Sequence, residues 1–164
     1  MTIFLFAIFA LLAIPLKSSL QALMVMSVIP FALVGAVGGH VLMGVGLNLF
    51  SLVGMLALIG VSVNDSLVMV DHVNQQKARG QDFMNAIKTS GATRFRAIML
   101  TSLTTFFGLV PLIFEKSTQA QFLVPMAISL GFGVLFVTIV TLFLIPVNFL
   151  ILEDIKKQLQ KIYS

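Results

Sequence analysis

A carboxylate lies inside an apolar stretch of the sequence that is long enough to cross a membrane. Residues 48–74 read NLFSLVGMLALIGVSVNDSLVMVDHVN, with Asp65 well inside the run and Asn64 before it. A charge inside a membrane helix costs a few kcal/mol, so such residues usually face a bundle interior and mark an ion or proton path. A carboxylate between apolar surroundings and a nearby cation can bind and release a proton as those surroundings alternate. We interpret Asp65 as a proton-carrying group; the alternative is a structural aspartate that fixes helix packing.

The neighbouring polar residues divide into those that share the face of Asp65 and those near the end of the run. Residues three, four and seven positions apart lie on one face of a helix, which places Ser62, Asp65 and His72 on one stripe. Asn64 is beside this stripe, about 100° round the helix. Asp71 and His72 are weaker candidates, because residues near the end of the run can simply be in contact with water.

A second polar stripe lies in the next apolar segment, where Arg94, Thr101, Thr105 and Gly108 are seven, four and three residues apart. This spacing places them on one helix face. Arg94 could approach an acid from the basic end of the segment, and the threonine hydroxyls could carry a hydrogen-bonded path inward. The ordinary alternative is that the threonines bond carbonyls of their own helix and that small residues allow close packing. Together with Asp65 and Asn64, the residues Arg94, Thr101 and Thr105 form the candidate proton relay.

The composition assigns the chain to a membrane rather than to water. Hydrophobic residues make up 59% of the 164 residues and charged residues 10%, against about 25% charged residues in an average soluble domain. The net charge of +4 comes from basic residues between and after the apolar segments. Membrane topology explains this pattern, so no nucleic-acid partner is expected. We find no cysteine, nucleotide-binding glycine loop, Ser/His/Asp constellation or metal-ligand spacing, and therefore expect no enzyme activity, cofactor or metal.

The apolar segments predict an all-α membrane protein, a bundle of about five transmembrane helices plus one short amphipathic surface helix. The spans are expected at 2–16, 20–43, 48–74, 97–114 and 122–152, with the others packed around 48–74. The first reaches only about 22 Å, less than the roughly 30 Å hydrocarbon core, so we interpret it as the tail of a longer helix. The surface helix is expected to have Asp82 as its N-cap. The glycines before His40 are interpreted as packing devices, and His40 as an interfacial or packing residue.

The basic residues predict how the bundle is oriented in the membrane. The loop 77–96 and the segment 156–161 carry most of the lysines and arginines, and basic loops stay on the cytoplasmic side. Five spans then place Lys17 on that side too, and leave the turns 43–47 and 115–121 outside. The carboxy terminus is predicted to be cytoplasmic, and the amino terminus to be on the outer side.

Three sequence motifs follow one another in a specific order. GVSVNDSLVMVDHVN is followed by an amphipathic link, then by TRFRAIMLTSLTTFFGLVPLIF and PMAISLGFGVLFVTIVTLFLIPV. This order resembles the carboxy-terminal membrane half of the resistance–nodulation–division (RND) efflux transporters, from about residue 3 to 155. The five spans are then similar to transmembrane helices eight to twelve of a twelve-helix protomer. Residues 1–155 would form the carboxy-terminal transmembrane domain fragment, and 156–164 a basic cytoplasmic tail.

The resemblance implies a proton-driven antiporter of the bacterial inner membrane that exports drugs or other amphiphiles and so confers multidrug resistance. It implies a homotrimer, with the amino-terminal membrane half, periplasmic domains and a periplasmic adaptor as partners. In well-known drug exporters of the family, a lysine at the position of Asn64 partners two aspartates of the fourth helix. Asn64 is neutral, so that exchange cannot be transferred to this chain. Arg94 and Thr101 match family positions proposed for the proton relay.

Two other functions remain open at this point. A relative of the same family could use this membrane fold to move lipids or to assist protein export. A non-transporting membrane scaffold is the alternative from another class, and in it Asp65 would only lock the packing of the helices.

Overall fold

The chain folds into helices joined by short turns. The computed structural model describes the backbone of residues 2–16 and 18–163, and the side chains of residues 6–16, 18–155 and 158. Within these ranges there is no β-strand, which confirms the predicted all-α class. The elements are α1 (Thr2–Leu16), α2 (Ser19–Met26), α3 (Ile29–Met43), α4 (Leu49–Ala78), α5 (Phe83–Ile113), a short 3-10 turn η1 (Ala120–Phe122) and α6 (Val124–Tyr163).

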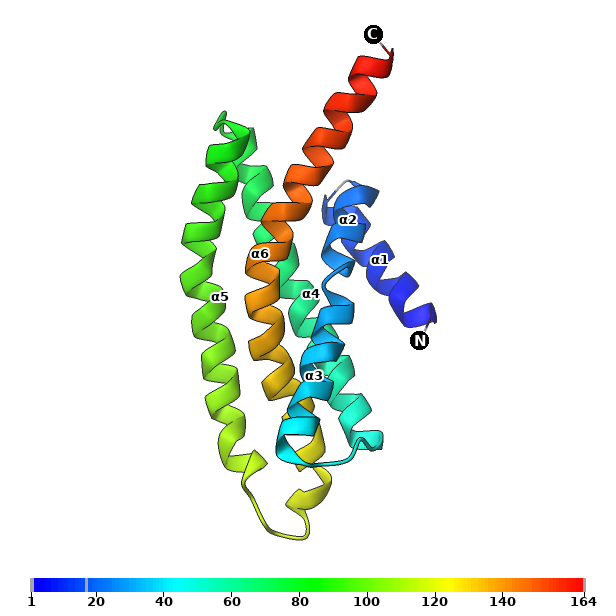
Figure 1. Cartoon of the computed structure of the whole chain (residues 1–164), viewed down its shortest axis with the longest axis vertical. Coiled ribbons are helices and arrows are strands. Elements are labelled where there is room, and N and C mark those ends of the chain that lie inside the picture. Colours follow the sequence, from blue (N-terminus) through cyan, green and yellow to red (C-terminus); the bar gives the residue numbers. More distant parts are fainter. Residues whose placement is uncertain (1, 17, 164) are drawn as a thin grey trace.

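Four of the described segments are long and apolar enough to cross a membrane. They are α2 together with α3, then α4, α5, and α6 as far as Ile155. The helix α1 is apolar but shorter, as its sequence predicted, and it packs against α2. Figure 1 shows α1 to one side of the bundle, with α2 between α1 and the long helices. The expected five spans therefore correspond to four full-length spans and one short apolar helix.

The connections alternate between the two ends of the bundle. The turn after α3 and the loop 114–123 lie at one end, and the turn 79–82 and the end of α6 lie at the other (Figure 1). This relative arrangement agrees with the predicted topology. The side of the membrane that each end faces stays a prediction, and Lys17 lies outside the described residues.

The helix that carries Asp65 begins where the sequence predicted. Asn48 caps α4: its side-chain oxygen accepts the backbone N–H of Ser51 at 3.0 Å, and the Ser51 hydroxyl accepts the N–H of Asn48 at 3.1 Å. This reciprocal pair satisfies two backbone donors that a helix start leaves open. The helix continues to Ala78, four residues further than expected, and the chain turns at Gly80, whose φ is +83°.

The centre of the bundle is α6 rather than the helix that carries Asp65. α6 packs against α3, α4 and α5 (Figure 1). Glycines permit the closest contacts, since Gly35 and Gly39 of α3 lie against phenylalanines of α6, and Gly133 of α6 lies against Leu58 of α4. The prediction that the glycines before His40 serve helix packing is therefore confirmed for Gly35 and Gly39.

One predicted boundary is absent. The amphipathic segment and the fourth span form a single helix, α5, which runs without interruption from Phe83 to Ile113. Asp82 is at the N-cap position, but its side chain makes no capping hydrogen bond. The chain continues as helix because residues 83–96 contain no proline, and their single glycine, Gly91, costs only about 1 kcal/mol. The expected surface helix is therefore the first part of α5.

Candidate functional site

Asp65 lies on α4 at the border between the packed and the open face of the helix. Its side chain is half-buried, and none of the described groups hydrogen-bonds or ion-pairs with the carboxylate. Asn64 beside it is exposed. In contrast, Ser62 and Ser66 are fully buried and donate to the carbonyls of Leu58 and Ser62, at 2.7 and 2.8 Å. The serine hydroxyls are therefore satisfied within α4, whereas the Asp65 carboxylate has no hydrogen-bond partner among the described residues.

The open face of α4 continues along most of the helix. Its exposed residues recur three, four or seven positions apart at Val53, Ala57, Gly60, Asn64 and Asp71. This spacing defines one stripe, which α3, α5 and α6 do not cover. From Val53 to Gly60 the stripe is apolar, so this part suits contact with another membrane helix and not with water. Asn64 and Asp71 are the polar members of the stripe.

On α5, the three candidate relay residues differ in their surroundings. Arg94 is partly buried, and its Nε is enclosed without a hydrogen-bond partner among the described residues. Thr101 is exposed and Thr105 half-buried. Their hydroxyls donate to the carbonyls of Ala97 at 3.0 Å and Thr101 at 2.8 Å, within the same helix. The threonines thus bond carbonyls of their own helix, as the alternative to the proton relay expects. No hydrogen bond joins them to Asp65.

A hydrogen bond between α4 and α5 fixes their relative register. The Nδ1 atom of His72 lies 2.9 Å from the Oγ atom of Ser90, which is fully buried. The two helices are antiparallel. Asp65, seven residues before His72 on α4, is therefore at the level of Ala97, seven residues after Ser90 on α5, because seven helical residues rise about 10 Å. Arg94 and Thr101 are about one turn away from that level on either side. The two candidates therefore flank the level of Asp65 on the neighbouring helix, and neither makes a hydrogen bond or ion pair with it.

The two weaker candidates belong to the end of α4. Asp71 is exposed and accepts a hydrogen bond from Nε2 of Gln75 at 2.7 Å. His72 is half-buried, and its imidazole contacts the hydroxyl of Ser90 on α5. None of the described helices covers Asp71, so its contact with water stays a prediction, whereas His72 faces α5.

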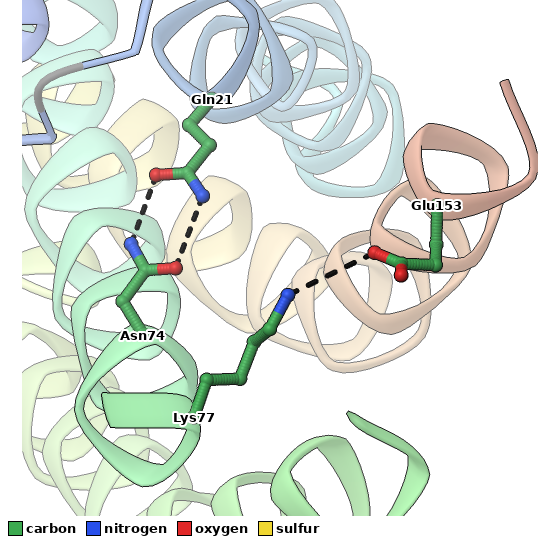
Figure 2. Close-up of polar contacts among 4 residues, drawn as sticks. All are labelled: Gln21, Asn74, Lys77 and Glu153. Carbon is green, nitrogen blue, oxygen red and sulfur yellow. Dashed lines mark hydrogen bonds and ion pairs between the residues drawn. The ribbon is translucent and has the colours of Figure 1, made fainter. Parts of the chain in front are cut away.

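Further polar residues hold the bundle together at the end that contains the 79–82 turn. The sequence did not predict them. Figure 2 shows Gln21 of α2 and Asn74 of α4 exchanging two amide hydrogen bonds, of 3.0 and 2.9 Å. Beside them, Nζ of Lys77 lies 3.8 Å from Glu153 of α6 and 4.7 Å from the ring centre of Phe83. No spacing rule could reveal these pairs, because their members are distant in sequence.

His40 is the polar residue that joins the helices at the opposite end. It is buried, with Nδ1 3.0 Å from the carbonyl of Val45 and Nε2 2.9 Å from the hydroxyl of Ser129. The carbonyl can only accept, so Nδ1 carries the proton; in the neutral ring the Ser129 hydroxyl then donates to Nε2. His40 is therefore a packing residue that ties α3 and the following turn to α6, and not an interfacial one.

The described residues form a bundle of long apolar helices, and this is the architecture of an integral membrane domain. The sequence model of the AcrB/AcrD/AcrF family matches residues 1–153. The chain therefore belongs to this family of RND efflux transporters and is a multi-pass membrane protein. This confirms the resemblance drawn from the motifs.

Individual relatives carry names of several kinds. The chain is 30% identical to the swarming motility protein SwrC of Bacillus subtilis, over 92% of its own length and 14% of that protein. It is 29% identical to the multidrug resistance protein MdtC of Pantoea ananatis, over 93% and 15%. It is 31% identical to the cobalt-zinc-cadmium resistance protein CzcA of Cupriavidus metallidurans, over 85% and 13%.

Two of the solved structures that match belong to a heavy metal efflux pump. One crystal form superposes with a TM-score of 0.78 at 26% identity, over 90% of this chain and 14% of that one. A second crystal form gives a TM-score of 0.80 at 25% identity, over 94% and 15%. The chain thus spans about one seventh of the proteins it matches.

Proposed function

We propose that this chain forms part of the membrane domain of a proton-driven efflux transporter and contributes half of its proton-coupling site. The observation that supports this most directly is the Asp65 carboxylate, half-buried in a membrane span and without a partner among the described residues. In this proposal Asp65 carries the proton. Asn64, on the adjoining open face, contacts the amino-terminal membrane half that completes the site.

The mechanism requires Asp65 to alternate between two environments. In one state the carboxylate is enclosed by apolar helices, and in the other a cation such as Arg94 approaches it while hydroxyls of Thr101 and Thr105 lead the proton inward. A change of two pKa units between the states corresponds to about 2.7 kcal/mol. A membrane potential of 100 mV supplies about 2.3 kcal/mol per charge. The two quantities match, so one proton per cycle can drive the conformational change.

Membership of the family supports a proposal for the assembly and its location. We propose a homotrimer in the bacterial inner membrane, with the 79–82 turn and the carboxy terminus in the cytoplasm. Periplasmic domains and an adaptor would complete the complex. Drugs or other amphiphiles are the proposed cargo, in line with the MdtC relatives. Metal cations are the second candidate, supported by CzcA and the heavy metal pump structures.

The test is proton-driven efflux by the full-length transporter in reconstituted vesicles. Asp65→Asn should abolish transport of an amphiphilic dye, or of Zn²⁺ if metal is the cargo, while expression and oligomer size are preserved. The control is Asp71→Asn, which removes a carboxylate from the same helix at an exposed position and should leave transport near the wild-type rate. Wild-type transport by Asp65→Asn under a pH gradient would refute the mechanism. Failure of Asp65→Asn to assemble would instead support the scaffold alternative.

A further inference from the structure

An apolar groove lies between the first half of α5 and the middle of α6. Its volume is about 530 Å³, and its walls include Gly91, Phe95 and Met99 of α5 and Ile139, Leu142 and Phe143 of α6. Phe95 is 52% exposed and Phe143 73% exposed. Two large aromatic side chains at such exposure indicate a surface that water does not contact in the assembled protein.

The groove is on the side of α5 that faces away from α4. Ser90 marks the α4 side through its hydrogen bond to His72. At 100° per residue, Phe95 and Met99 lie about 140° and 180° round α5 from Ser90. If the amino-terminal half of the transporter covers Asn64 and Asp65, as proposed above, this opposite side faces the lipid.

One basic residue, Lys88, stands at one end of the groove, and a second, Arg96, lies along its wall. Lys88 precedes Gly91, Phe95 and Met99 by three, seven and eleven residues, so it shares their face and lies about one turn beyond the apolar part. Both Lys88 and Arg96, which lies between Phe95 and Met99 in sequence, are exposed. In the part of the chain that the structure describes, the one ion pair joins Lys77 to Glu153. The charges of Lys88 and Arg96 are thus available to an outside partner.

We propose that this groove binds an anionic phospholipid. One acyl chain lies against Phe95 and Phe143, and the phosphate contacts the Lys88 ammonium, with Arg96 beside it. The apolar stems of both basic side chains can extend along the membrane while their charged ends reach the headgroup level. The same end of the bundle is predicted to be cytoplasmic, and anionic lipids of that leaflet attract basic residues near the membrane surface. Apolar walls with the Lys88 ammonium beyond one end match the shape and charge of such a lipid.

The experiment uses the full-length transporter in dioleoylphosphatidylcholine vesicles that contain a small fraction of phosphatidylglycerol with a photoactivatable acyl chain. After illumination, mass spectrometry should locate the label in residues 91–99 and 139–143. Unlabelled phosphatidylglycerol should compete, and phosphatidylcholine should not. One basic residue near the surface contributes about 1 kcal/mol, so Lys88→Ala should reduce labelling about five-fold. Gly91→Leu, which fills the groove from an open position, should nearly abolish it.

Matched variants separate this site from general effects. Lys116→Ala removes a lysine from the opposite end, and Gly108→Leu adds bulk at another open glycine of α5; both should label like the wild type. Asp65→Asn should also label normally, because lipid binding does not require proton coupling. Equal labelling by a phosphatidylcholine probe, or unchanged labelling of Lys88→Ala, would overturn the proposal. Absence of label from these segments would overturn it too, and would show that another helix occupies the groove.

Discussion

Gly39 of α3 lies directly against Phe132 of α6, so closely that a Cβ atom on Gly39 would overlap the Cβ and Cγ atoms of the phenylalanine. Because rotation of the Phe132 side chain does not move its Cβ, a Gly39→Ala substitution must push α3 and α6 apart. Overpacking of this kind costs about 1–3 kcal/mol. We expect a lower thermal unfolding midpoint for Gly39→Ala in the full-length protein in mild detergent, measured by the loss of monodisperse protein on heating.

The neighbouring glycine supplies the control. No atom lies within 4 Å of a Cβ built on Gly38. Gly38→Ala should therefore leave the midpoint unchanged or raise it slightly, because alanine is the better helix former. If both substitutions lowered it equally, the effect would come from glycine flexibility and not from the contact between α3 and α6.

The second prediction concerns topology. Gln81 and Ser117 are exposed in turns at opposite ends of the bundle (Figure 1). Because the basic residues cluster near Gln81, this end should be cytoplasmic. In a cysteine-free full-length background, Gln81→Cys should react with an impermeant thiol reagent only after the membrane is opened. Ser117→Cys should react in intact cells, and accessibility of both from one side would contradict the arrangement.

The loop after α5 contains a carboxylate whose titration can be predicted. Glu115 accepts the backbone N–H groups of Ser117 and Lys116, both at 3.0 Å, and these bonds hold the pKa of its carboxyl below the ordinary value of 4.5. Since the folded pKa lies below the unfolded one, these bonds stabilise the turn fully above pH 4.5. That contribution is lost as the pH falls through the folded pKa.

Carbon NMR of the 164-residue chain in detergent micelles tests this directly. The sequence contains two glutamates, Glu115 and Glu153, so selective labelling of glutamate gives two carboxyl signals. Glu115→Gln removes one signal and thereby assigns it. The Glu115 signal should titrate with a midpoint below 4.5, and a midpoint at or above that value would show that the turn is not formed.

The sequence predicted those parts of the fold that depend on local chemistry. Asn48 was expected at the beginning of its helix, and the cap is formed there because the Asn48 amide and the Ser51 hydroxyl can satisfy each other's backbone groups. The boundary expected between the surface helix and the fourth span is absent. A change from polar to apolar side chains alters the surroundings of a helix but does not break its backbone hydrogen bonds.

The parts that depend on distant contacts could not be predicted. Gln21 could pair with any amide in the bundle, and only the packing of α2 beside α4 selects Asn74. The sequence also did not predict that α6 lies at the centre of the bundle, because all the long segments are similarly apolar. At the candidate site, the sequence identified Asp65 as an isolated acid. The register between α4 and α5 required the contact between His72 and Ser90.

The last prediction concerns the contribution of α5 to proton coupling. Arg94 and Thr101 lie about one turn on either side of the level of Asp65 and make no hydrogen bond or ion pair with it. Arg94 and Thr101 should therefore assist the transfer of the proton to and from Asp65, which carries it. Arg94→Ala or Thr101→Val should reduce proton-driven efflux about three- to ten-fold, comparable to the loss of one hydrogen bond.

The conservative variants decide whether charge and hydroxyl are the active properties. Arg94→Lys keeps a positive charge, and Thr101→Ser keeps a hydroxyl at the same position. In reconstituted vesicles, both should transport faster than Arg94→Ala and Thr101→Val at every pH gradient tested. If Thr101→Ser were as slow as Thr101→Val, the hydroxyl would have no part in the path, because the two differ in the group that can bond a proton carrier. Wild-type rates in all four variants would remove α5 from the coupling site and leave Asp65 to act with the amino-terminal half alone.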